Sequence, residues 1–195
     1  MLLGGVTCFN DMYFFPEAAA TAASELGMRA MLGITTLEFP TPYASDADDY
    51  IDKGLAVREQ WRNHPLIGFC LAPHAPFTVS DTSFARILTL SEQLNLPIHC
   101  HIHETRQEIE ESRQRHGETP LARLGRLGLL GPGFIGVHAV HLDDDDLELL
   151  AATGCSIAHC PTSNLKLANG IAPVARMRQL RINVGLGTDG AASNN

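Results

Sequence analysis

The chain has 195 residues, a formal net charge of -8 at pH 7 and a pI near 5.5. This length allows one sizeable core, and no shift in composition divides the sequence, so we predict a single domain over residues 1–195. Lys and Arg form no cluster, which argues against a nucleic-acid or anionic-membrane partner and favours a small, neutral or weakly charged substrate.

Short apolar runs alternate with longer amphipathic runs along the whole chain. The apolar runs predict strands at 2–11, 28–35, 66–73, 97–103, 134–140, 156–160 and 183–188. The amphipathic runs predict helices near 15–27, 46–62, 80–95, 105–116, 119–128, 143–153 and 171–180, with Ser80 as the N-cap of the third. The predicted strands are apolar on both faces, which is typical of buried parallel strands.

Seven strand-helix units are compatible with a doubly wound sheet or with a barrel. Polar residues decide between them, because six fall at or just past the carboxyl ends of different predicted strands: His74, His101, Glu104, His138, His159 and Asp189. A barrel gathers such ends around one pocket, whereas an open sheet spreads them along an edge. We therefore predict an α/β fold of the (β/α)8 TIM-barrel type, incomplete, with strands 2 to 8 present and strand 1 and the last helix missing. Its two open edges would expose unpaired backbone groups.

The tract PIHCHIHET, residues 97–105, carries three histidines at alternating positions and then a carboxylate. In a strand, His99, His101 and His103 would point to one side. Neutral imidazoles bind transition metals, and a nearby Glu104 could move protons for a metal-bound water. The pattern predicts a metal or catalytic role for at least one histidine. It leaves open a core position for His99, a solvent-exposed position for His103 past the strand end, and a role for Glu104 as the first acid of the next helix.

Other candidates follow later strands. Asp189, in the tract VGLGTDG, follows an apolar run that we expect to be buried, and we favour a metal ligand over a turn cap. His138 is preferred to His141 as the functional histidine of VHAVHL. The acidic run Asp143 to Asp146 is interpreted as charge at a helix N-terminus. His159 is expected to shape a loop rim together with Pro161.

The five cysteines are an odd number and form no Cys-x-x-Cys pair, so we expect reduced, buried residues and a cytoplasmic protein. No signal peptide is recognised at the start, and no apolar run approaches the roughly 18 residues that a membrane span needs. The sequence leaves the formation of a homo-oligomer open.

Several tracts together resemble the amidohydrolase superfamily, and within it 5′-methylthioadenosine/S-adenosylhomocysteine deaminases and triazine hydrolases. The tracts are GGVTCFNDMYF (4–14), APHAPFTVS (72–80), HIHET (101–105), VHAVHL (137–142), HCPTSNLKLANGIAPV (159–174) and GLGTDGAASNN (185–195). They run through essentially the whole chain in the order of the family.

The resemblance implies one divalent metal, usually zinc, and hydrolytic removal of an amino group from a heteroaromatic ring of a small molecule. His101 would be the metal ligand from the fifth strand, and Asp189 the ligand from the eighth and the acceptor of a proton from the attacking water. Glu104 would carry a proton to the ring nitrogen. His138 would polarise the water or the tetrahedral centre, and His74 would contact the substrate, as Glu104 and Asp189 also do.

One departure from the family affects the expected activity. The family's His-x-His pair on the first strand, which supplies two further ligands, is not in this chain, nor is the ribose-binding carboxylate that precedes the second strand. We therefore expect the parent enzyme to act on an adenine-type nucleoside such as methylthioadenosine or S-adenosylhomocysteine, and the isolated chain to bind metal weakly and turn over slowly or not at all. The alternatives are a triazine chlorohydrolase, a guanine or cytosine deaminase, and an inactive truncated barrel that acts only as a binding module.

Overall fold

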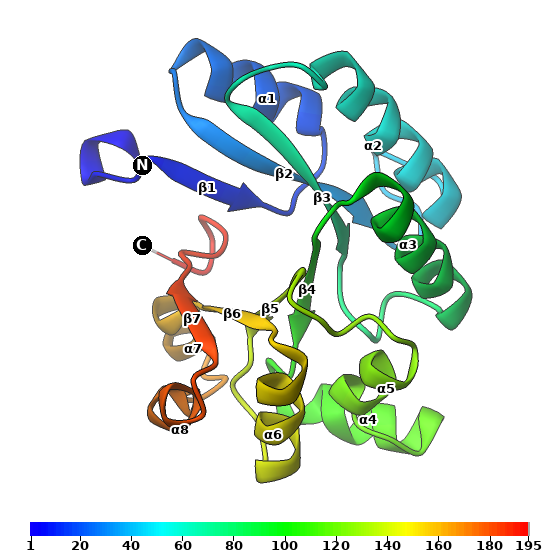
Figure 1. Ribbon diagram of the computed structural model, residues 1–195, viewed down its shortest axis with the longest axis vertical. Coiled ribbons are helices and arrows are strands. Elements are labelled where there is room, and N and C mark those ends of the chain that lie inside the picture. The colour runs from blue at the N-terminus through cyan, green and yellow to red at the C-terminus, as the bar shows by residue number, and fades with distance from the viewer. Residues whose placement is uncertain (195) are drawn as a thin grey trace. The chain divides into compact units, whose positions relative to one another are not determined.

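The computed structural model describes residues 1–194, in which strands and helices alternate (Figure 1). The chain forms two compact units. The first contains Met1–His74 and Thr78–His99, and the second contains Ala75–Phe77 and the chain from Cys100 onward. The strand pairings defined in each unit are parallel, which confirms the predicted α/β class.

The first unit is built on strands that neighbour one another in chain order. They are β1 (Cys8–Asp11), β2 (Arg29–Thr36), β3 (Ile67–Pro73) and the first residues of β4 (Ile98–Ile102). Its helices are α1 (Pro16–Glu25), α2 (Ala47–Trp61) and α3 (Asp81–Leu94). Leu32, Ile34, Ile51, Leu71 and Ile87 are fully buried, so apolar strand residues and one face of each helix make the core of this unit.

The prediction of a strand over residues 2–11 is wrong at its start. A 3-10 helix, η1 (Leu2–Gly4), occupies this part, and β1 begins only at Cys8. Gly5 has a φ of 81°, a left-handed conformation that glycine adopts without steric cost and that ends the turn. Leu2, Leu3 and Val6 are exposed, so the apolar character of this part does not reflect a buried strand.

The second unit continues from β4 through three more strands in chain order, β5 (Phe134–His138), β6 (Ser156–His159) and β7 (Asn183–Leu186). Its helices are α4 (Arg106–His116), α5 (Pro120–Arg126), α6 (Asp144–Thr153), α7 (Pro161–Lys166) and α8 (Val174–Gln179). Gly136 allows β4 and β5 to pack closely, since a Cβ atom there would lie 2.4 Å from Ile102 Cδ1. The contact fixes the strand that carries His101 against the strand that ends in His138.

Two helix starts form as the sequence predicts. The Ser80 hydroxyl accepts a hydrogen bond from the backbone N–H of Ser83 at the start of α3. At α6 the carboxylates of Asp143 and Asp146 each accept the other residue's backbone N–H, at 2.9 and 3.2 Å, which is a capping box. The acidic run is thus a helix N-terminus, as interpreted from the sequence.

Two burial predictions need correction. The apolar run at 183–188 is largely exposed, and Leu186 keeps 83% of its surface, because β7 pairs with β6 on one side among the described residues. Four of the five free cysteines are buried as expected, whereas Cys8 is exposed in β1. Within residues 1–194, none of the helices has the length and apolar character that crossing a membrane requires.

Candidate metal centre

Two imidazoles and a carboxylate converge in the second unit. His101 lies in β4, His138 ends β5, and Asp189 follows β7, and one potential ligand atom from each lies within 4.8 Å of the others. The rings of His101 and His138 are stacked, with centroids 5.3 Å apart. The family resemblance implies His101 and Asp189 as ligands and His138 as a neighbouring catalyst, and the structure brings all three side chains within the span of one ion.

The backbone at these strand ends adopts the left-handed region, which residues other than glycine rarely occupy. The φ angles are 71° at His138, 48° at Ala139, 49° at His103 and 59° at Asp189. Such conformations cost on the order of 1–3 kcal/mol each and persist where the surrounding structure holds them. Their concentration beside the three converging side chains makes this edge of the second unit a candidate functional site.

Asp189 receives two hydroxyl hydrogen bonds on the same oxygen. Ser163 Oγ donates to Asp189 Oδ2 at 2.5 Å, and Ser193 Oγ donates to it at 2.8 Å. Partial burial opposes ionisation, but these bonds, a bond from the backbone of Gly190 and the charge of His138 outweigh it and lower the pKa of Asp189. Asp189 is therefore an anionic oxygen donor suited to bind a cation.

His138 is held by an amide. Its Nδ1 lies 2.9 Å from Asn164 Oδ1, and both side chains are buried. Because an amide oxygen only accepts, Nδ1 donates the proton of this bond, and Nε2 is the ring nitrogen that faces the other site residues. This Nε2 lies 3.6 Å from Glu104 Oε2, which is just beyond hydrogen-bond distance, so a small movement of either side chain would bring the two groups into contact.

Glu104 stands between β4 and α4. It precedes Thr105, the N-cap of α4, and the acid in the first turn of that helix is Glu108, so the alternative role as first helical acid is wrong. Asn169 Nδ2 donates to Glu104 Oε1 at 2.8 Å. One carboxylate oxygen is thus anchored while the other faces His138.

His103 is buried, so the solvent-exposed position that the sequence leaves open for it is wrong. Its Nδ1 donates to the carbonyl of His141 at 2.9 Å and lies 3.4 Å from Asp146 Oδ2, while the N–H of Leu121 donates to its Nε2 at 3.1 Å. Burial opposes ionisation of Asp146, but the hydrogen bond from His103 and the bonds from Asp143 outweigh it and lower the pKa of Asp146. Both ring nitrogens of His103 are therefore engaged in joining the end of β4 to α5 and α6.

Two histidines of the sequence analysis belong to the first unit. His99 is buried in β4, in agreement with the core position left open for it. His74 follows β3 and is half-buried, with its Nδ1 3.0 Å from Thr78 Oγ1. The contact between His74 and a substrate stays a prediction.

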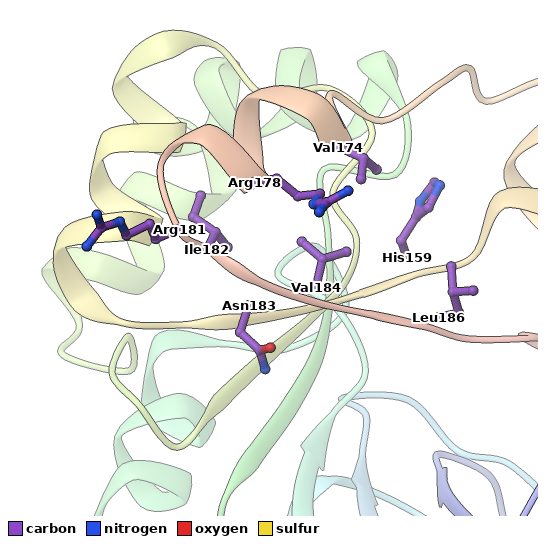
Figure 2. Close-up of a pocket in the computed structure, with 8 residues that line it drawn as sticks. All are labelled: His159, Val174, Arg178, Arg181, Ile182, Asn183, Val184 and Leu186. Carbon is purple, nitrogen blue, oxygen red and sulfur yellow. The ribbon is translucent and has the colours of Figure 1, made fainter.

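His159 lines a separate pocket of about 620 Å³ in the second unit, formed by Val174, Arg178, Arg181, Ile182, Asn183, Val184 and Leu186 together with it. Figure 2 shows His159 and Leu186 at one end of this pocket and Arg181 at the other. Burial and the charge of His138 lower the pKa of His159. The prediction that His159 and Pro161 shape a loop rim is wrong, since His159 ends β6 and Pro161 begins α7. The residues that line the pocket include none of His101, His138 and Asp189.

Three polar residues that hold the site were not predicted: Ser163, Asn164 and Asn169. They lie in or just after α7, in the tract HCPTSNLKLANG. The available signal was a set of small polar residues between the strand ending in His159 and the next helix. Such residues are also usual in loops, so the sequence alone assigns them no partners.

Comparison with known proteins gives consistent results. The family model described as "Amidohydrolase family" matches residues 1–195. A 5-methylthioadenosine/S-adenosylhomocysteine deaminase from Saccharophagus degradans is 51% identical over all of this chain and 44% of its own length. The chain therefore spans less than half the length of this relative.

Solved structures are similar as well. An adenosine deaminase from Xanthomonas campestris with bound zinc aligns with a TM-score of 0.96 and 45% identity, covering 100% of this chain and 44% of that one. An atrazine chlorohydrolase from Arthrobacter aurescens complexed with zinc aligns with a TM-score of 0.91 and 24% identity, covering 99% and 47%. The second likeness concerns the fold alone.

Proposed function

Because this chain belongs to the amidohydrolase family, we propose that the protein containing it is a metal-dependent aminohydrolase that deaminates an adenine-type nucleoside, methylthioadenosine or S-adenosylhomocysteine. The observation that carries the proposal is the convergence of His101, His138 and Asp189 within 4.8 Å. The relative at 51% identity supports the substrate class. For the whole protein we propose the (β/α)8 barrel of the family, with which the parallel strands of both units agree.

The donor set fits a zinc ion. Two imidazole nitrogens and one carboxylate oxygen are typical zinc ligands, and the lowered pKa of Asp189, where hydrogen bonds outweigh burial, keeps its oxygen charged. His101 and Asp189 would hold the ion, and His138 lies close enough to join them or to face a water beside it. Bound zinc would supply Lewis-acid activation of a water molecule near neutral pH.

The chain's own side chains would divide the proton transfers. Asp189 would accept a proton from the attacking water. Glu104, anchored by Asn169 through Oε1, would deliver a proton to the ring nitrogen beside the carbon under attack. His138, with Nδ1 occupied by Asn164, would present Nε2 toward the developing tetrahedral centre and toward Glu104.

The test measures deamination directly. The full-length protein is loaded with zinc, and ammonia release and the change in adenine absorbance are followed with methylthioadenosine, S-adenosylhomocysteine, guanine and a chlorotriazine. We expect the two thionucleosides to be the best substrates. Ammonia release from none of the nucleosides, with stoichiometric zinc bound, would refute the proposal, and preferential dechlorination of the triazine would replace the substrate class.

A matched variant separates the proton carrier from the metal ligands. Glu104→Gln keeps the shape and the bond to Asn169 Nδ2 through its amide oxygen, but it cannot donate a carboxylic proton. We expect kcat to fall by about 10²- to 10⁴-fold with zinc content unchanged. Loss of zinc from this variant would instead make Glu104 a ligand.

A further inference from the structure

One short segment touches three members of the metal centre. Ser163 Oγ donates to Asp189, Asn164 Oδ1 accepts from His138 Nδ1, and Asn169 Nδ2 donates to Glu104. The distances are 2.5, 2.9 and 2.8 Å. We propose that residues 163–169 are a positioning segment that sets the orientation of Asp189, His138 and Glu104 together. The catalytic part of this inference rests on the proposed function, whereas the part that concerns metal affinity does not.

The backbone of the segment explains how one stretch reaches three side chains. Ser163 and Asn164 are buried on the inner side of α7, while Thr162 and Leu165 beside them are exposed. After α7 the chain turns back through Ala168, whose φ is 59°, and the N–H of Asn169 donates to the carbonyl of Asn164 at 2.8 Å. The turn brings the side chain of Asn169 to the same site from the other end of the segment.

The far end of the segment is fixed by a second bond. His141 Nε2 donates to the carbonyl of Asn169 at 2.7 Å, so the backbone of Asn169 is tied to the loop after β5 while its side chain holds Glu104. Gly170 follows with a φ of 122°, a conformation that other residues rarely adopt. The backbone of Asn169 is therefore held by the surrounding fold, and its side chain in turn orients Glu104.

At Asp189 the segment acts on a proposed ligand. Ser163 is fully buried, and its hydroxyl donates a hydrogen bond to Asp189 Oδ2. The hydroxyl of Ser193, which lies on the exposed side of the site, donates a second hydrogen bond to the same oxygen. Two donors on one oxygen fix the carboxylate plane and direct the other oxygen. Partners of this kind, which hold a ligand without touching the metal, typically change metal affinity by about 10- to 100-fold when removed.

At Glu104 the segment acts on the proposed proton carrier. Asn169 bonds Oε1 and leaves Oε2 facing His138 Nε2 at 3.6 Å. Without the amide, the carboxylate could rotate away from the proton path although the metal ligands stay in place. Such misplacement lowers the rate of the chemical step more than it weakens substrate binding.

The first test concerns zinc affinity and needs no substrate. In the full-length protein, Ser163→Ala is compared with Thr162→Ala, which removes an exposed hydroxyl from the neighbouring position of the same helix. Zinc dissociation constants are measured by competition with a chromophoric chelator, and circular dichroism checks the fold. We expect about 10- to 100-fold weaker zinc binding for Ser163→Ala and no change for Thr162→Ala. Equal affinity in all three proteins would overturn the role of Ser163.

The second test separates kcat from KM. We expect Asn169→Ala to lower kcat by about 10- to 100-fold, with KM within about twofold and zinc affinity unchanged. Asn169→Asp keeps the shape but lacks the N–H donor, and it should be at least as impaired because two carboxylates then face each other. Unchanged kcat in Asn169→Ala, or a loss explained by missing zinc, would refute the role of Asn169. If the wild-type protein deaminates no nucleoside, the proposed function fails, and the zinc comparison still decides on Ser163.

Discussion

Replacing Glu108 with glutamine is expected to remove a strong pH dependence of stability. Glu108 lies in the first turn of α4, and only 5% of its surface is exposed. Its Oε1 is buried and has no hydrogen-bond partner among residues 1–194. Burial raises the pKa of Glu108 from 4.5 to about 7, with a further rise from the charge of Glu104 and an opposing effect of His103.

The sign follows from proton binding in the two states. The folded chain holds the proton of Glu108 more tightly than the unfolded chain, so the stabilisation is fully present below pH 4.5 and is lost as the pH rises through about 7. One pKa unit corresponds to about 1.4 kcal/mol. Between about pH 5 and about pH 8, the free energy of unfolding should therefore fall by about 2.5 kcal/mol more in the wild type than in Glu108→Gln.

Urea unfolding of the metal-free protein at both pH values measures this difference. Glu110→Gln is the matched control, because Glu110 is exposed on the same helix and should give the wild-type pH dependence. Titrating groups that do not interact with Glu108 are common to all three proteins and cancel in the comparison. If the difference in unfolding free energy between the wild type and Glu108→Gln stays constant within about 0.5 kcal/mol between the two pH values, the argument that burial dominates the pKa of Glu108 is refuted.

Three further predictions concern the second unit. Asp143→Ala removes the capping box of α6 and should lower the free energy of unfolding by about 1 kcal/mol in urea titrations, whereas no change would mean that Asp146 caps the helix alone. Gly136→Ala should cost about 1–3 kcal/mol, because the added Cβ would lie 2.4 Å from Ile102 Cδ1; a wild-type midpoint would show that Ile102 can move aside. Asp146→Asn should cost about 1–3 kcal/mol near neutral pH, since a neutral amide replaces the charged partner of His103. The pKa of Asp146 is lowered because its bonds with His103 and Asp143 outweigh burial. Its contribution to the free energy of unfolding is therefore present above pH 3.8 and lost as the pH falls, so the stability of Asp146→Asn should depend less steeply on pH in acid.

The sequence predicts the alternation of strands and helices because buried parallel strands and amphipathic helices leave different apolar patterns. The helix α7 escapes this reasoning, since its six residues from Pro161 to Lys166 are too short to display a period. The start of the strand predicted at residues 2–11 is wrong for a related reason, because an apolar run does not show whether its residues are buried, and β1 forms only from Cys8 to Asp11.

The site could be predicted only in part. His101, Glu104, His138 and Asp189 lie at or just past strand ends, and the topology of parallel strands brings such ends together. The position of His103 was not predictable, since its burial depends on Leu121 and Asp146, which come from two later helices. Contacts between residues so far apart in sequence leave no local pattern.

The anchoring residues and the proposed reactive residues of the candidate metal centre differ in solvent exposure. The anchoring residues Ser163 and Asn164 are 0% and 1% exposed, so the packing of α7 fixes their positions. Glu104 keeps 25% of its side chain accessible, and Asp189 is exposed, which the proton exchange proposed for them requires. Because the reactive groups are open while their anchors are closed, loss of an anchor should disturb geometry without blocking access. We therefore expect the Ser163 variant to weaken metal binding and the Asn169 variants to slow the chemical step. A general loss of folding would lower both properties together in each variant.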